Sequence, residues 1–366
     1  MKTSAKESVT AFWFLLPFLL ALAVFFAYAF GRTVYFSFTN YDLFNKLDFV
    51  GFGSYLNTVR DPLFITALGN TFIFSILVTV LQTIGALLLA IVLNQKLSGL
   101  GFFRTAYYFP SIASSAVTTL IFIWLFRPTG LISYFGTVLG NSAAWIGVFV
   151  LILIIAQAIQ VLLERSRSLP ASWFDPALLV VSIIAALIGA SLLNAFGVIR
   201  IGDADPTPLT WLSSREKLLG ILPYPLAVII VMNTFTTIPT LMLTFLAGLQ
   251  GISNSVYEAA SIDGATPVQQ MLYITVPMLR PVTFYVVTVS IIGTLQMFDQ
   301  AAMLDGTAPL EGTITLAYFV YNAIFRGSGD AQVGVASAAA LILALLTLGV
   351  VQIQRRFFVS DEGAGK

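Results

Sequence analysis

The sequence SNSVYEAASIDGATPVQQMLYITVP, residues 253–277, forms a polar loop between two long apolar segments. Its pattern predicts two short helices separated by a glycine. Ser255 and Glu258 have the spacing of a capping box, which predicts that the first helix starts at Ser255. Gly264 can adopt the left-handed conformation that ends a helix, and Thr266 can cap the next one. A compact pair of helices at a membrane surface is suited to docking on a partner rather than to chemistry.

This loop resembles the EAA loop of ABC importer permeases. AGLQ at 247–250 precedes the loop and ITVPMLRP at 274–281 closes it, and together they are similar to the carbohydrate branch, the maltose-type permeases. Weaker resemblance covers 11–126 and 211–366. The resemblance implies a cytoplasmic loop whose helix fits a cleft on an ATPase subunit. The residues that it implies for this coupling are Glu258, Ala259, Ala260, Asp263 and Gly264.

The composition of the 366 residues predicts a membrane protein, because 58% are hydrophobic and only 10% are charged. Soluble proteins carry roughly 25% charged residues. We therefore expect an all-α integral membrane protein, a polytopic helix bundle. The chain has neither cysteine nor histidine, which excludes disulfides, thiol catalysis and Ser-His-Asp chemistry. A net charge of +1 gives no reason to expect nucleic acid.

Uncharged runs between charged residues predict eight transmembrane helices. They lie near 11–31, 65–93, 105–126, 143–163, 176–199, 219–247, 279–298 and 333–354. A secretory signal peptide is the alternative for the first run, but typical signal cores have only about 7–15 residues. Because the run of 21 residues is long enough to span a bilayer, we interpret it as a retained helix.

The resemblance implies about six helices, so two of the eight are extra. We interpret residues 140–205 as an inserted transmembrane hairpin between an N-terminal part, 1–139, and a permease core, 206–366. The insertion is interpreted as lipid-facing padding in preference to a regulatory or partner-binding element. An inserted pair leaves the orientation of the later helices unchanged.

The orientation rests mainly on the resemblance, which places both termini and the 253–277 loop in the cytoplasm of a bacterial cell, with the protein in the inner membrane. With that orientation, ten of the 18 basic residues lie on the cytoplasmic side, which is only a weak positive-inside signal. The loop between Glu164 and Trp173 is then also cytoplasmic.

A polar stripe runs along the sixth predicted helix. Asn233, Thr237, Thr240 and Thr244 are spaced to share one helical face, and Pro239 lies among them. Proline frees a backbone carbonyl and bends a helix. The stripe has two interpretations: it lines a sugar path, or it is packing between helices, for which Ser and Thr are common. The resemblance favours the lining role, because the corresponding helix lines the substrate site in maltose-type permeases.

The seventh predicted helix carries a second set of polar residues. Ser290 and Thr294 share one face, and Gln296 and Asp299 lie near the outer end. The resemblance places substrate contacts on this helix, so Ser290, Thr294 and Gln296 join Asn233, Thr237 and Thr240 as candidate lining residues. A carboxylate at bilayer depth is costly, and we therefore interpret Asp299 as an interfacial residue.

These observations favour a permease subunit of an ABC sugar importer. The resemblance implies a second permease, two ATPase subunits and an extracytoplasmic solute-binding protein. The chain has no phosphate-binding loop and no acidic metal cluster, so we expect no cofactor, no metal and no enzymatic activity of its own. The alternatives are a stand-alone secondary transporter or channel and an intramembrane enzyme. Few basic groups lie in the predicted helices, which favours a neutral glycan, although glycerol phosphate and aminosugars remain open.

Overall fold

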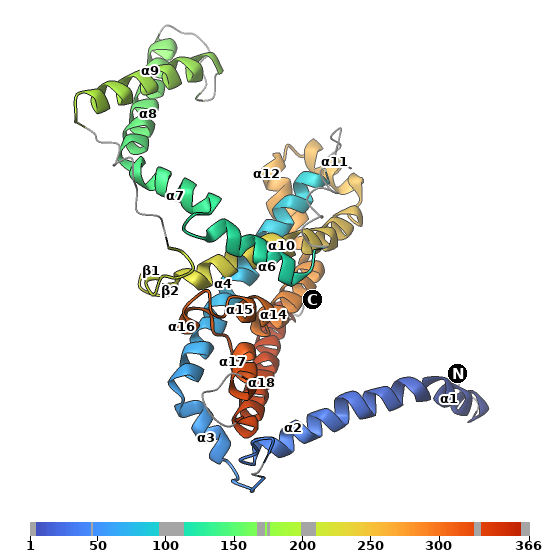
Figure 1. Cartoon of the computed structure of the whole chain (residues 1–366). Helices are drawn as coiled ribbons and strands as arrows, with labels where there is room; N and C mark the ends of the chain where they lie inside the picture. The colour runs from blue at the N-terminus through green and yellow to red at the C-terminus, as the bar shows by residue number, and fades with distance from the viewer. Residues whose placement is uncertain are drawn as a thin grey trace. The chain divides into compact units, whose positions relative to one another are not determined.

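The computed structural model describes residues 5–44, 47–94, 113–166, 173, 176–198, 210–325 and 331–359 (Figure 1). Two compact units make up the chain: Met1–Phe122 with Leu212–Lys366, and Ile123–Trp211. The beginning of the expected helix 105–126, most of the Glu164–Trp173 loop and both extreme termini lie outside the described residues.

Most of the described residues of the first unit are helical. Its N-terminal half has α1 (Ala5–Leu22), the π-helix η1 (Ala23–Tyr28), α2 (Ala29–Ser37), α3 (Gly53–Arg60), α4 (Pro62–Leu93) and the start of α6 (Ser115–Phe126). Its C-terminal half begins with a small hairpin, β1 (Lys217–Leu218) and β2 (Leu222–Pro223). The helices that follow are α10 (Tyr224–Gln250), α11 (Asn254–Ile262), α12 (Pro267–Gln270), the π-helix η2 (Met271–Thr275), α13 (Val276–Met278), α14 (Arg280–Leu295), α15 (Asp299–Met303), α16 (Leu310–Thr313), α17 (Leu316–Phe325) and α18 (Val333–Val359).

Eight helices in the described residues are long and apolar enough to cross a membrane, which confirms the predicted polytopic all-α class. The first of them is longer than expected, since it runs from Val9 to Ser37. Arg32 was taken to mark its end, but its guanidinium lies 4.5 Å from the ring centre of Phe36 and the helix continues past it. A cationic side chain that covers an aromatic ring is compatible with a continuing helix.

The third apolar segment also extends beyond its expected end at 126, because α7 (Leu131–Asn141) follows α6 and the segment reaches Asn141. Gly130 ends the turn between them. A Cβ atom at this position would lie 2.4 Å from the carbonyl oxygens of Trp124 and Leu125. Residues 127–130 thus form a tight turn between two helices.

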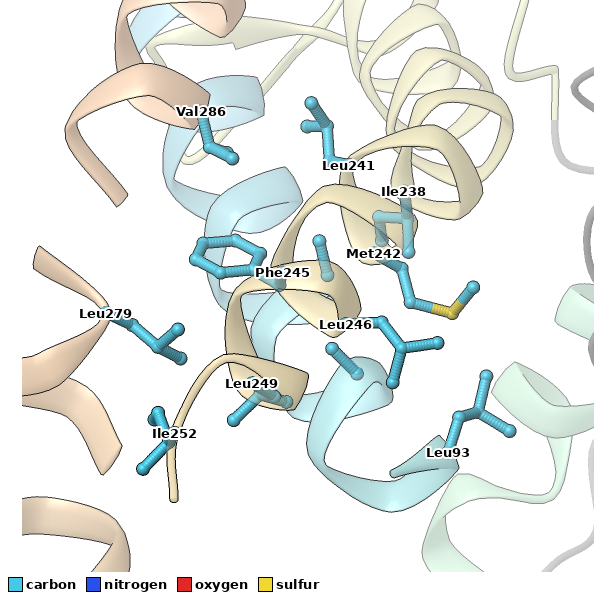
Figure 2. Packing of buried hydrophobic residues seen from close by; sticks show 12 residues of the cluster. Leu93, Ile238, Leu241, Met242, Phe245, Leu246, Leu249, Ile252, Leu279 and Val286 are labelled. Carbon is cyan, nitrogen blue, oxygen red and sulfur yellow. The ribbon is translucent and has the colours of Figure 1, made fainter. Parts of the chain in front are cut away.

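The apolar core of the first unit lies between α4, α10 and α14 (Figure 2). Phe245 and Met242 of α10 are fully buried, and Leu279 and Val286 pack against them from the α14 side. Glycine permits close approach at Gly248, where a Cβ atom would lie 2.8 Å from a methyl group of Val282. Such close packing stabilises helix association in lipid, where burial from water does not drive it. This core positions the middle of α10, which lines one candidate site, and its C-terminal end, which leads into the other.

The second unit contains the end of α6, α7, α8 (Ala143–Ser166) and α9 (Pro176–Ala195). α8 and α9 pack against each other. A buried hydroxyl joins them: Ser182 Oγ donates to Gln157 Oε1 at 2.6 Å and accepts from Gln160 Nε2 at 3.0 Å. Polar bonds of this kind hold helix pairs together within a membrane.

Candidate coupling loop and solute cavity

The first loop helix, α11, is capped two residues earlier than predicted. Its N-cap is Ser253, whose hydroxyl accepts from the Ser255 backbone N–H. The prediction that Ser255 caps the helix in a box with Glu258 is therefore wrong. Ser255 lies inside the first turn, and its hydroxyl is 2.8 Å from that of Ser253. α10 ends at Gln250 and its chain turns at Gly251, and Ser253 then has the extended backbone of a cap, with φ −65° and ψ 135°.

The end of α11 and the start of α12 follow the sequence pattern. Gly264 has φ +80°, as predicted for the residue that terminates the helix. The backbone N–H groups of Gly264 and Ala265 donate to Ser261 and Ala260, at 3.1 and 2.9 Å, which is the Schellman arrangement. Thr266 caps α12 in a complete capping box with Gln269, which confirms that prediction. Both ends of α11 and the start of α12 are therefore capped.

Two side-chain bonds attach α11 to the segment that leads into α14. The Tyr257 hydroxyl lies 3.0 Å from the Thr275 hydroxyl of η2, and Gln270 Nε2 donates to Ser261 Oγ at 2.9 Å. The ring of Tyr257 also packs against the α4–α10–α14 core. The loop helix is thus joined by polar bonds to the segment that leads into α14 and by packing to the α4–α10–α14 core.

Other side chains of α11 are exposed. Glu258, Ala259 and Asp263 are exposed, and Ile262 has 87% of its surface accessible. Asn254, Tyr257, Glu258, Ser261 and Ile262 line an open hollow beside the helix. A carboxylate next to an accessible apolar side chain on a short, capped helix is a surface suited to a partner with a basic and apolar cleft.

A second feature, the solute cavity, lies between the start of α6, the middle of α10 and α15. It has a volume of about 310 Å³. Six of its lining residues carry a hydroxyl or an amide: Ser115, Thr118, Thr236, Thr237, Thr240 and Gln300. The helix α10 runs through Pro239 without interruption beside this cavity. No charged side chain lines the cavity among the residues that the structure describes.

The predicted stripe on α10 meets this cavity in part. Thr237 and Thr240 line it, whereas Asn233 lies beside it and is joined to Gln300, with Nδ2 donating to Oε1 at 3.0 Å. Gln82 of α4 donates to Asn233 Oδ1 at 2.7 Å. Sequence reasoning missed both glutamines. Gln300 follows Asp299 directly in the sequence, and Gln82 lies in α4, a long apolar helix with several other polar residues, among them Asn70 and Ser75. A glutamine within an apolar helix indicates a buried partner, and this signal was left unused.

The candidates on α14 are placed differently from the expectation. Ser290 and Thr294 are buried, and the Thr294 hydroxyl lies 2.8 Å from the Ser75 hydroxyl of α4. Thr294 therefore bonds across to α4, and neither Ser290 nor Thr294 is among the residues that line the cavity. Gln296, the C-cap of α14, is exposed and is also absent from the lining.

A third hollow, of about 900 Å³, lies where the α2–α3 connection meets the beginning of α18. Its polar lining includes Asn40, Asp42, Asn57 and Gln332. The backbone approaches closely here, because a Cβ atom at Gly334 would lie 2.1 Å from the Thr39 carbonyl oxygen. Glycine at this position thus lets α18 pack directly against the connection that follows α2.

A polytopic helical protein with a polar cavity and a capped, exposed loop helix has the features of a transport permease. Comparison with known proteins narrows this class. It is 27% identical over 362 residues to the arabinooligosaccharides transport system permease protein AraP of Bacillus subtilis (strain 168), with 98% of this chain and 92% of AraP covered. The sn-glycerol-3-phosphate transport system permease protein UgpA of Yersinia pestis is 26% identical, with 93% of each chain covered.

The same fold occurs in the crystal structure of a bacterial ABC transporter involved in the import of the acidic polysaccharide alginate, with a TM-score of 0.67, 17% identity and coverage of 97% of this chain and 96% of that chain. No family model matches the chain. The prediction of an ABC importer permease subunit is confirmed. The protein is a multi-pass inner-membrane permease, and its relatives are transport permeases and not enzymes.

Proposed function

We propose that this chain forms half of the translocation pathway of an ABC sugar importer and transmits closure of two ATPase subunits through α11. The observation that carries the proposal is the attachment of an exposed, doubly capped helix to the membrane core through Tyr257 and Thr275. A force applied to the exposed face of α11 reaches α14 through this bond and the packing around it. Glu258, Ala259, Ala260, Asp263 and Gly264 are the proposed coupling residues.

We propose that the solute cavity holds the transported molecule, with Thr237 and Thr240 in its wall. The lining hydroxyl groups and the Gln300 amide match the donors and acceptors of a neutral sugar. An anionic solute such as sn-glycerol-3-phosphate favours a basic partner, and the described lining residues include none. The lining therefore favours a neutral oligosaccharide, the class for which AraP is named.

The proposed assembly contains a second permease subunit and an extracytoplasmic solute-binding protein as well as the two ATPases. Both termini and the 253–277 loop are proposed to be cytoplasmic. With this orientation, the large hollow beside the start of α18 opens on the outer side of the membrane. Its polar lining suits contact with the solute-binding protein. Residues 140–205 are proposed to be a lipid-facing insertion, since the outward side chains of α8 and α9 are apolar.

Transport by the assembled complex tests the proposal. Vesicles that contain the chain with its co-expressed partners should take up ¹⁴C-labelled arabinotriose when ATP and binding protein are supplied. Uptake of sn-glycerol-3-phosphate should be weaker. Glu258→Ala should reach the membrane at normal levels and lose both uptake and stimulated ATP hydrolysis.

The matched control is Glu216→Ala, which removes another exposed carboxylate, on the side proposed to face outward. It should behave as the wild type. Uptake driven by an ion gradient without ATP would instead establish a secondary transporter. Wild-type uptake and stimulated ATP hydrolysis in the Glu258→Ala variant would show that α11 does not transmit closure of the ATPases.

A further inference from the structure

Three side-chain amides form a continuous chain from the interior of α4 to the solute cavity. Gln82 Nε2 donates to Asn233 Oδ1 at 2.7 Å, and Asn233 Nδ2 donates to Gln300 Oε1 at 3.0 Å. The three residues come from α4, α10 and α15, so the chain joins three separate elements of one unit. Gln300 lines the cavity, whereas Gln82 is only 1% exposed.

The buried end of the chain determines its direction. In the observed direction, Gln82 Oε1 is a buried acceptor without a hydrogen-bond partner. Turning all three amides round would keep both bonds but would leave the Gln82 NH₂ group, with two N–H donors, unpartnered in the same place. Buried orphan N–H groups are rarer than under-satisfied carbonyl oxygens. The observed direction is therefore favoured, and the Nε2 group of Gln300 remains available at the cavity.

We propose that Gln82 is a positioning residue that sets which group the cavity offers to the solute. By donating to Asn233, it turns the Asn233 amide so that this amide donates to Gln300, whose NH₂ group then donates to an acceptor oxygen of an uncharged, hydroxyl-rich solute. The surrounding serine and threonine hydroxyls can donate or accept, so the Gln300 amide is the lining group whose role as a hydrogen-bond donor is set. The inference rests on the proposed function, in which the cavity holds the solute.

Gln82→Met tests the positioning role, because methionine has nearly the shape of glutamine and lacks the amide. Without the donor, Asn233 is free to turn, and the solute loses a held hydrogen bond. We expect KM for arabinotriose uptake to rise about tenfold, the effect of one lost hydrogen bond of ordinary strength, while the maximal rate and the stimulated ATP hydrolysis stay within twofold of the wild type. Gln300→Met should raise KM by a similar factor.

Gln354→Met is the matched control. Gln354 is also a buried glutamine within a membrane helix, where its amide bonds to Thr288 Oγ1 and to the Phe284 carbonyl oxygen. It lies outside the cavity lining, so this variant should keep the wild-type KM. An unchanged KM in Gln82→Met, or an equal rise in Gln354→Met, would overturn the proposal.

A melting experiment on the purified complex needs no solute and separates this inference from the proposed function. Gln82 and Gln300 are joined through Asn233, so the decrease in Tm for the double variant Gln82→Met/Gln300→Met should be smaller than the sum of the two single decreases. A sum of the single effects would refute the amide chain. Vesicles that take up neither arabinotriose nor sn-glycerol-3-phosphate would count against the proposed substrate class. The melting result would still show whether Gln82 and Gln300 are coupled through the amide chain.

Discussion

Gly264→Val offers the sharpest test of the loop as a lever. Gly264 has φ +80° and terminates α11. Nothing lies within 4 Å of a Cβ atom placed there, so the cost of a side chain is backbone strain alone. That strain is about 1–2 kcal/mol in the left-handed region. The bilayer-embedded core is not involved, so the complex should assemble normally. The strain is sufficient to change the population of the closed turn by a factor of about 5–30.

The readout is binding-protein-stimulated ATP hydrolysis in reconstituted vesicles, with Gly306→Val as the control. Gly306 has φ +76° and equally empty surroundings, in the turn that follows α15. Its strain should match that of Gly264→Val, but its turn is proposed to face outward, away from the ATPases. We expect Gly264→Val to lose most of the stimulation, Gly264→Asn to lose less because asparagine tolerates this conformation, and Gly306→Val to retain it. Equal stimulation in both valine variants would refute the reasoning.

Three further predictions concern the cap, the cavity and the topology. Ser253→Ala should destabilise α11 by about 1 kcal/mol and speed hydrogen exchange of its first turn, whereas Ser255→Ala should have little effect; the reverse order would restore the cap expected from the sequence. Thr237→Leu places an apolar group in the cavity wall and should reduce arabinotriose uptake without loss of assembly with the ATPases, measured by co-purification; normal uptake would leave Thr237 as packing. Impermeant thiol reagents should label Thr307→Cys but not Ser166→Cys in intact cells, and the opposite result would contradict the proposed orientation.

Local features of the loop were predictable because they depend on residues that are close in the chain. The Thr266–Gln269 capping box and the Gly264 terminator each need only a few neighbouring residues. The N-cap of α11 was not predictable in the same way. Two serines stand near the start, and the chance spacing between Ser255 and Glu258 imitates a capping box, so the choice depends on where α10 ends.

The sequence by itself determined the membrane class, the number of apolar helices and the polar face of α10, because hydropathy and helical period are properties of the chain alone. Only the tertiary structure decided what each polar face meets. Thr294 meets Ser75, and Asn233 meets Gln82 and Gln300, with separations of 219, 151 and 67 residues. A buried amide or hydroxyl requires a partner, but its own helix does not specify which distant helix supplies it. That choice follows from the packing of α4, α10 and α14, where small residues let helices approach until their few polar groups meet.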